Sequence, residues 1–281
     1  KKLNEEKQVK KNLKQNNFEK SFFTYINKKN FFKYLDHLSK NLDYPVFHPH
    51  LLTLYTLIKK IKSRKFKVAI SGDGADEFFS GYYWYNNKKR YNDRQMMQLG
   101  TSFKEKIFDK IILNNKFHKK SYNNFLKKFR KDTLKLDYYN KLRYFNQNIY
   151  LDKWFRTRDS IGMLEGIEIR VPYCDTKLFQ LANSKSHKNH ENKKVLKQIA
   201  IKNNFRHVAK KIGFTIPIMS WLDKKTVQKL LLKTNFYKSK DYNFAKIEEL
   251  FKLHFSKKIN IDRTIWCLIA FETWKKYHFS Y

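Results

Sequence analysis

The sequence predicts an α/β fold in which a parallel sheet near the start is followed by a largely helical half. Two short apolar runs in the first 90 residues alternate with amphipathic segments, as strands and crossover helices do in parallel sheets. Beyond residue 90, apolar residues recur at three-to-four spacing almost to the end. With 281 residues, 41% of them hydrophobic, the chain can bury a substantial core. We therefore expect an α/β part over 1–90 and a helical part over 91–281.

The two apolar runs are the expected strands of this sheet, Ser21–Ile26 and Phe66–Ser71. The apolar run of the second predicts a buried strand. Each Pro of the segment 42–49 disfavours helix before it, so this segment is expected to be a loop. The remaining segments of the α/β part predict helices: 4–16, the segment after Asn30 with Phe31, Phe32, Leu35 and Leu38, and Leu51–Ile61.

The helical part is expected to contain seven helices, because seven segments carry apolar residues at helical spacing. They are 103–113, 136–165, 175–184, 191–204, 223–233, 243–255 and 262–277. The basic stretch 116–132 is weakly patterned and predicts a mobile loop. Such helices can close over the carboxyl ends of the strands, where ligands of parallel sheets bind.

The formal net charge of +36 raises the question of nucleic-acid binding. A basic stripe gains affinity through counterion release, and the 25 Phe and 18 Tyr residues could stack on bases. Lys greatly outnumbers Arg, however, and the lysines are scattered along the chain instead of forming one tract. We therefore expect a generically basic surface and no specific nucleic acid as a partner.

Membrane, metal and disulfide signals are weak in this sequence. No run approaches the ~18 apolar residues of a membrane span, so no membrane partner is expected. His48 and His50 flank a proline without a third ligand, which favours loop histidines over a metal site. Cys174 and Cys267 lack metal-ligand spacing, and two thiols make no disulfide framework, which favours buried thiols in a reducing cytoplasm. The sequence starts at Lys1 without a signal peptide, so we expect a chain trimmed at its start.

The most informative segment is Lys67–Tyr82, KVAISGDGADEFFSGY, which contains three of the seven glycines. Glycine is used where φ is positive or where a ligand must approach the backbone closely. A strand end followed by Ser71, Gly72 and the acids Asp76 and Glu77 could hold a phosphate–metal complex. The alternative is a tight strand-to-helix turn whose acids cap the next helix. The residue types alone leave both interpretations open.

Two later segments are informative but more ambiguous. Glu168 and Arg170 stand next to Pro172, which predicts a structural ion pair that holds a loop. Lys193 opens a basic amphipathic segment, whose residue types favour a solvated helix face. Lys210–Pro217 is expected to be a loop, with its glycine just past a helix end.

In their order along the chain, several segments resemble the synthetase domain of glutamine-dependent asparagine synthetases. That domain is an ATP-pyrophosphatase (PP-loop) α/β fold with a helical half. The segments are Ser71–Tyr82, Asp159–Asp175, Lys193–Lys197, Gly213–Leu222, Trp266–Trp274 and Leu42–Pro45, which is similar to the family's Leu-Asp-Glu-Pro. The S-G-D-G-A-D-E and E-x-R-V-P motifs are the most specific of them, and the resemblance covers most of the chain.

The resemblance implies an amide ligase that uses ATP and Mg²⁺. Its substrate would be aspartate or a related carboxylate, which is amidated through a β-aspartyl-AMP intermediate with release of pyrophosphate. The ammonia would come from glutamine, through a glutaminase domain that this chain does not contain. A homodimer is compatible with this interpretation.

The resemblance also assigns the nucleotide and metal ligands. It implies that Ser71 and Gly72 contact the nucleotide, together with Asp76 and Lys193. Asp76 and Glu77 would hold Mg²⁺ on the departing pyrophosphate. This assignment is physically sensible, because charge that develops on phosphate oxygens needs a fixed counter-charge in a dry site.

Two residues take the catalytic roles that the resemblance implies. Asp73 matches the acidic position tied to forming and aminating the acyl-adenylate. Lys193 matches the lysine that stabilises the transition state at the α-phosphate, which reverses the solvated-face interpretation. A compact ammonium on a flexible stem suits phosphate charge.

The sequence departs from the family in several places. Nothing matches the Ser-Gly-Gly-x-Asp-Ser phosphate loop at the end of the family's first strand, and the glutaminase domain is absent. Ser160 and Lys197 stand where arginine is usual, and no glycine shortly precedes Lys193. We therefore expect an incomplete synthetase domain, lacking its first PP-loop strand and inactive alone.

Two other functions remain open at this stage. A relative that amidates a different carboxylate, on a sugar or a peptide, would share these motifs. A basic, non-catalytic nucleic-acid-binding protein would share the charge and the aromatic content.

Overall fold

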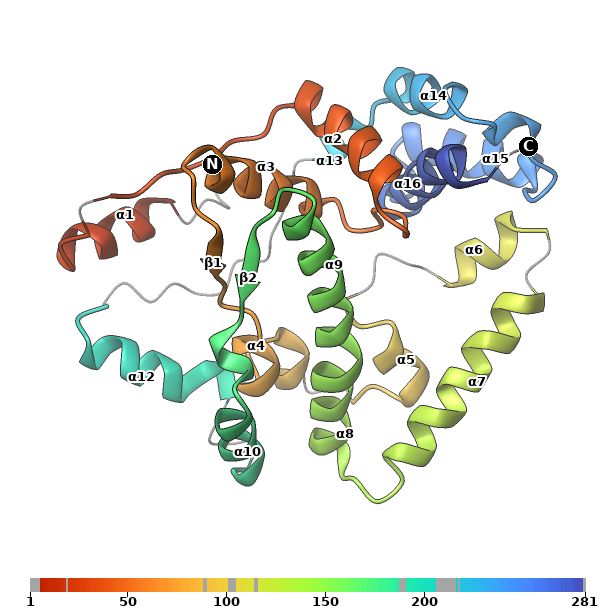
Figure 1. Ribbon diagram of the computed structural model, residues 1–281. Coiled ribbons are helices and arrows are strands. Elements are labelled where there is room, and N and C mark those ends of the chain that lie inside the picture. Colours follow the sequence, from red (N-terminus) through yellow and green to blue (C-terminus); the bar gives the residue numbers. More distant parts are fainter. Residues whose placement is uncertain are drawn as a thin grey trace. The chain divides into compact units, whose positions relative to one another are not determined.

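A computed structural model describes residues 6–18, 20–87, 90–100, 105–113, 116–186, 191–205, 216 and 218–279. It is mostly helical, with a small parallel sheet (Figure 1). The chain forms two compact units. The sheet unit comprises Lys1–Thr24, Lys59–Met97 and Thr133–Thr215, and the helical unit comprises Tyr25–Ile58, Gln98–Asp132 and Ile216–Tyr281. The predicted α/β class is confirmed, whereas the division at residue 90 stays a prediction.

The sheet pairs β1 (Val68–Ile70) in parallel with β2 (Glu168–Arg170), so that Ala69 lies opposite Ile169 (Figure 1). The ladder continues beyond β1, because the amide of Ser71 donates to the carbonyl of Arg170 at 2.8 Å. The predicted strand at 66–71 is therefore confirmed. Its predicted burial is wrong, since Val68 is 39% and Ile70 76% exposed. Successive side chains alternate between faces, so both of these residues lie on one uncovered face.

Two sequence-based predictions about strands are wrong. Ser21–Ile26 is irregular and forms no strand. Its phenylalanine rings contact cations instead: the Phe22 ring lies 5.9 Å from the Arg64 guanidinium carbon, and the Phe23 ring lies 5.1 Å from the Lys10 amine. The second strand comes from residues 168–170, in the part expected to be helical. An apolar run becomes a strand only where another strand pairs with it, and that partner lies about 100 residues away in sequence.

The helices predicted over 4–16, 136–165, 175–184 and 191–204 are confirmed in the sheet unit, whereas the short helices at 83–86, 93–97 and 172–174 were not predicted. A nearly continuous helix confirms the segment 136–165, with a π-helical turn at its centre. Asn146 in this turn donates to the Tyr85 hydroxyl at 3.0 Å. The elements are α1 (Glu6–Gln15), α4 (Ala75–Phe78), η1 (Tyr83–Asn86), α5 (Asp93–Met97), α8 (Tyr138–Phe145), η2 (Asn146–Tyr150), α9 (Leu151–Met163), η3 (Pro172–Cys174), α10 (Thr176–Ser184), η4 (Glu191–Lys193) and α12 (Lys194–Lys202).

The helical unit packs around α16, whose buried face includes Trp266. The indole of Trp266 donates to the carbonyl of Val46 at 3.0 Å, and that of Trp274 donates to Leu42 at 3.0 Å. These bonds fix the loop that was predicted over 42–49. The elements are α2 (Lys28–Asn41), α3 (His50–Ser63, which continues into the sheet unit), α6 (Glu105–Ile111), α7 (Lys116–Asp132), α13 (Ile218–Trp221), α14 (Lys224–Leu232), η5 (Phe236–Lys238), α15 (Phe244–Phe255) and α16 (Asp262–His278).

Helix α7 corrects the prediction of a mobile loop over 116–132. Its buried positions include Leu126 and Phe129, three residues apart, while basic residues occupy the solvated side. Lys128 and Asp132 pair one helical turn apart at 2.8 Å. The apolar stripe is too sparse to stand out in a sequence so rich in lysine. Helix α2 also begins earlier than expected, because the Asn27 side chain caps it by accepting from the amide of Asn30.

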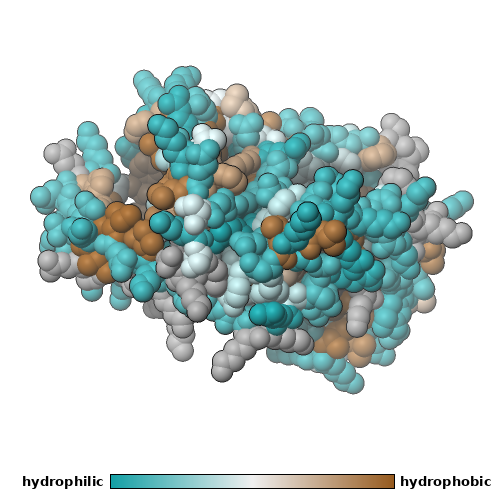
Figure 2. Space-filling model, turned by 90° about the horizontal axis from the view of Figure 1, so that it is seen from below, coloured by the Kyte–Doolittle hydropathy of each residue, from teal (hydrophilic) through white to brown (hydrophobic). Residues whose placement is uncertain are grey.

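The surface agrees with the high net charge. On the face shown in Figure 2, hydrophilic side chains surround separate hydrophobic patches. Within the part of the chain that the structure describes, no helix is long and apolar enough to span a bilayer.

Candidate functional site

The candidate site begins where β1 ends and the chain turns into the one-turn helix α4. Gly74 makes this turn possible, because its φ of 90° lies in the region that favours glycine. A Cβ at this position would also come within 2.6 Å of the Cys174 sulfur. The close contact with the segment after β2 therefore depends on the glycine that the sequence analysis singled out.

Asp76 and Lys193 meet in this site although 117 residues separate them in sequence. The Lys193 Nζ lies 3.0 Å from the Asp76 Oδ1, and both side chains are about three-quarters buried. The backbone amide of Lys193 donates to the carbonyl of Phe79 at 3.0 Å, which anchors η4 against the end of α4. Lys193 thus lies beside Asp76 and is largely buried, whereas its residue type alone favoured a solvated helix face.

Gly81 explains how Asp76 reaches this position. Its amide donates to the Asp76 carbonyl at 2.9 Å, so that the chain folds back over the aspartate. A Cβ on Gly81 would lie 1.8 Å from the Asp76 Oδ1. Only a displacement of Asp76 could relieve this overlap. Glycine is therefore required at position 81 because the Asp76 carboxylate occupies the space of a side chain.

Asp73 is held from two directions. The Ser71 hydroxyl donates to its Oδ2 at 2.6 Å, and the Arg158 guanidinium forms an ion pair with its Oδ1. Arg158 projects from α9 and lies over the Trp154 ring, with 5.6 Å between the guanidinium carbon and the ring centre. Burial lowers the pKa of Arg158 to about 10. The sequence analysis did not select Arg158, because only the fold brings α9 to the end of β1.

Glu77 differs from the other acids of the motif in being 4% exposed. It accepts a hydrogen bond from the Tyr82 hydroxyl, and the Tyr82 ring stacks on Trp84 with centroids 4.2 Å apart. Burial, with Glu77 as a further cause, raises the pKa of Tyr82 far above its ordinary value. The Glu77–Tyr82 contact ties α4 to the aromatic segment that follows it.

Gly72 lies at the open side of the site. It is exposed, and a Cβ built on it would meet nothing within 4 Å. Neither φ nor protein packing therefore calls for glycine here, so the residue is free to serve a close approach by a ligand. Ser71, which precedes it, is half-buried and already orients Asp73.

Asp76 and Glu77 do not belong to a preformed metal cluster, since the described residues contain no group of three His, Cys, Asp or Glu that could hold an ion. This arrangement still fits Mg²⁺, which is usually bound by one or two carboxylates together with waters and substrate phosphates. Of the two acids, Asp76 lies beside the ammonium of Lys193, whereas Glu77 is engaged by Tyr82.

One predicted loop lies mostly outside the described residues, and one predicted ion pair lies within them. Residues 206–215 and 217, which include most of the loop predicted over Lys210–Pro217 and the start of the segment Gly213–Leu222, are outside the described residues. Glu168 and Arg170 form an ion pair at 2.9 Å as predicted, although they belong to a strand and not to a loop.

The sheet and its site define an α/β protein whose polar groups gather at the carboxyl end of a parallel strand, where such sheets bind ligands. The sequence matches the family described as asparagine synthase over residues 2–276, and the chain belongs to that family. It is also 27% identical over 297 residues to "Asparagine synthetase [glutamine-hydrolyzing] 1" of Bacillus subtilis (strain 168). The alignment covers 86% of this chain and 46% of the relative, so the chain spans about half the relative's length. The resemblance stated from the motifs is thereby confirmed.

Proposed function

We propose that the sheet unit carries the ATP-dependent step of an amide ligase that converts the side-chain carboxylate of aspartate into an amide. The observation that carries the proposal is the meeting of Asp76 and Lys193 at 3.0 Å beside the glycine-rich end of β1. Membership of the asparagine synthase family supports the same reaction. An acid and an ammonium at a strand end are the groups that a nucleotide polyphosphate and its cation require.

In the first step, a carboxylate oxygen of the substrate attacks the α-phosphorus of ATP, and pyrophosphate leaves. Lys193 would stabilise the negative charge that builds up on the α-phosphate oxygens. Ser71 and Gly72 would contact the nucleotide at the open side of the site. Asp76, with Glu77 behind it, would hold Mg²⁺, whose charge offsets that of the departing pyrophosphate.

In the second step, ammonia attacks the acyl carbon, loses a proton and displaces AMP. We assign Asp73 to this step and to formation of the acyl-adenylate. Its two oxygens are fixed by Ser71 and Arg158, so the carboxylate keeps a single orientation toward the reacting atoms. Arg158 would act as a positioning residue for Asp73.

The substrates and partners of the whole protein belong to this proposal. Aspartate would be the acceptor, and ammonia would be derived from glutamine, as the name of the Bacillus relative indicates for that protein. The PP-loop topology, the use of Mg²⁺, the association into a homodimer and the inactivity of the chain alone remain predictions.

The test is pyrophosphate release by the protein as its gene encodes it, with ATP, Mg²⁺ and ammonium present. Aspartate is compared with glutamate, succinate, a sugar acid and a short acidic peptide. We expect release that depends on aspartate, with asparagine formed in equal amount. Release with only one of the other acids would assign a related amidotransferase. Release without any acid, or none with every acid, would contradict the proposal.

A further inference from the structure

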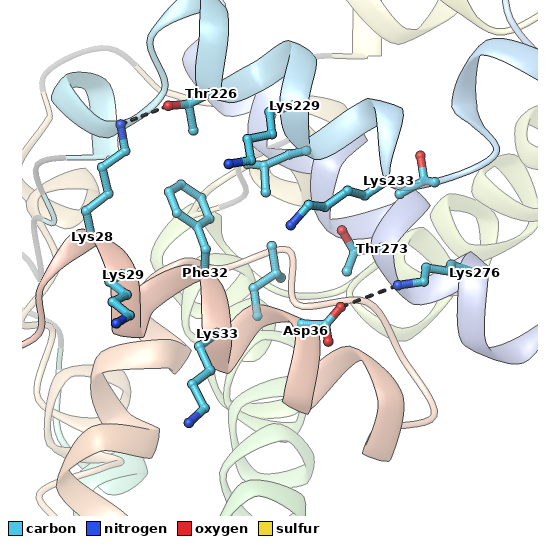
Figure 3. A pocket seen from close by; sticks show the side chains of 13 residues that line it. Lys28, Lys29, Phe32, Lys33, Asp36, Thr226, Lys229, Lys233, Thr273 and Lys276 are labelled. Carbon is cyan, nitrogen blue, oxygen red and sulfur yellow. Dashed lines mark hydrogen bonds and ion pairs between the residues drawn. The ribbon is translucent and has the colours of Figure 1, made fainter.

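The helical unit contains a cavity of about 590 Å³ that is bordered by α2, α14 and α16 (Figure 3). Its walls are strongly basic, since six lysines and a single acidic residue, Asp36, line it. The lysines are Lys28, Lys29, Lys33, Lys229, Lys233 and Lys276. This cavity belongs to the helical unit alone, so it is separate from the site at the end of β1.

Two of these lysines are already neutralised by acids. Lys276 lies 3.7 Å from Asp36, which also accepts from the Tyr277 hydroxyl at 2.7 Å. Lys28 pairs with Asp223 at 2.8 Å, at the N-terminal cap of α14. Asp223 and Asp36 therefore pair with Lys28 and Lys276 and not with the other lysines of the cavity.

The other lysines of the cavity lack an acidic partner among the described residues. Lys229 lies in α14 and Lys233 is the C-cap residue that follows it, and Figure 3 shows their amines pointing toward α2. Lys29 and Lys33 stand one turn apart on α2. The like charges of Lys229 and Lys233 repel each other, and an anion bound between them would remove that cost.

The cavity also has an apolar wall. The ring of Phe32 lies beside the Lys229 amine in Figure 3, and Leu35 and Leu230 line the cavity as well. Small-molecule sites typically combine such apolar walls with a few polar groups in a volume of about 300–1,000 Å³. The hollow is thus suited to a compact anion better than to an extended polymer, which binds along grooves and stripes.

We propose that this cavity binds a small ligand that carries two or more phosphate groups. The phosphates lie between the ammonium groups of Lys229 and Lys233, on the side of α2 that carries Phe32. Phe32 offers a face on which an aromatic part of the ligand can stack. Inorganic tripolyphosphate and a nucleoside triphosphate both carry the phosphate groups that the lysines would bind. Only the nucleoside triphosphate has a base that could stack on the Phe32 ring.

The test compares tripolyphosphate and ATP as probes in isothermal titration calorimetry at about 0.1 M salt, where exposed charges are partly screened. The variant Lys229→Gln/Lys233→Gln removes the two inward amines. Lys224→Gln/Lys225→Gln is the matched control, because it removes the same charge from the same helix outside the cavity.

We expect tripolyphosphate to bind the unaltered protein, and to bind Lys229→Gln/Lys233→Gln at least about tenfold more weakly, a loss of about 1.4 kcal/mol. Affinity within about twofold of the unaltered protein is expected for the Lys224→Gln/Lys225→Gln protein. Circular dichroism and the melting temperature show whether each variant is folded. If ATP binds about tenfold more tightly than tripolyphosphate and Phe32→Ala abolishes this difference, Phe32 stacks on the base of the nucleotide. If the two probes bind equally, the site recognises the phosphates only.

Three results would overturn the proposal. The first is the absence of tripolyphosphate binding, and the second is an equal loss in the Lys229→Gln/Lys233→Gln and Lys224→Gln/Lys225→Gln proteins, which marks general surface charge. The third is an affinity for single-stranded oligonucleotides that rises steadily with their length and is lost in Lys229→Gln/Lys233→Gln, which marks a nucleic-acid surface at this cavity.

Discussion

Gly81 lies so close to Asp76 that the identity of one residue decides the position of another. In Gly81→Ala the added carbon would overlap the Asp76 carboxylate, and overpacking of this kind costs roughly 1–3 kcal/mol. We expect Asp76 to move away from Lys193, which weakens the dependence of pyrophosphate release on Mg²⁺. The measurement is a Mg²⁺ titration of that release.

Gly72→Ala provides the contrast, because its new carbon would meet no protein atom. We expect an unchanged melting temperature and at least about tenfold weaker ATP binding if the nucleotide approaches Gly72 closely. Binding equal to that of the unaltered protein would remove Gly72 from the nucleotide site.

Arg158 is the residue that sequence reasoning alone missed, and its role is testable. Arg158→Gln removes the ion pair with Asp73 but leaves the Ser71 hydrogen bond. We expect amide formation to fall about a hundredfold, because small displacements of an oriented group cost that much. Arg156→Gln, which removes an exposed arginine from the same helix, is the control. Equal rates for the two variants would show that Asp73 needs no orientation by Arg158.

At the scale of elements, α16 contains a buried acid with a predictable pH effect. Glu272 is 1% exposed and accepts from the Tyr242 hydroxyl at 2.7 Å. Burial raises its pKa, so the folded state binds this proton more tightly than the unfolded state. Its contribution is therefore fully present below the unfolded pKa and is lost as the pH rises through the folded pKa.

Glu272→Gln keeps an acceptor for Tyr242 and removes the ionisation. We expect this variant to be more stable than the unaltered protein at neutral pH, with the difference shrinking as the pH falls toward 4. Melting temperatures measured across this pH range test the expectation. A constant difference at every pH would contradict the burial argument.

The sequence predicted helices well and strands poorly, for a physical reason. A helix such as α9 satisfies its hydrogen bonds locally, so its apolar spacing is visible in the sequence. β1 needs β2, and residues 168–170 carry no signal that a partner lies 100 positions earlier. The missed helix α7 carries its buried Leu126 and Phe129 among many basic residues, which obscure its apolar spacing. The site motif was visible because its residues are consecutive, whereas the approach of Arg158 and α9 depends on the fold.

At the scale of the whole molecule, the charge of +36 predicts binding to polyanions without sequence preference. We expect the affinity for duplex DNA to fall steeply, by roughly 10³-fold or more, between 50 and 200 mM salt. Fluorescence anisotropy with two unrelated duplexes of equal length provides the measurement. Tight binding at physiological salt to only one duplex would instead favour a specific nucleic-acid function.

The fold brings distant parts of the chain together at Lys193. Its residue type alone favoured a solvated position, whereas the fold pairs it with Asp76. The most direct measurement is ATP–pyrophosphate exchange that depends on the acceptor acid, in Lys193→Ala and in the control Lys194→Ala, whose side chain is exposed. We expect the exchange rate to fall about a hundredfold or more in Lys193→Ala, while ATP binding changes little. Lys194→Ala should exchange at the normal rate. Normal exchange in Lys193→Ala would contradict the role assigned to Lys193.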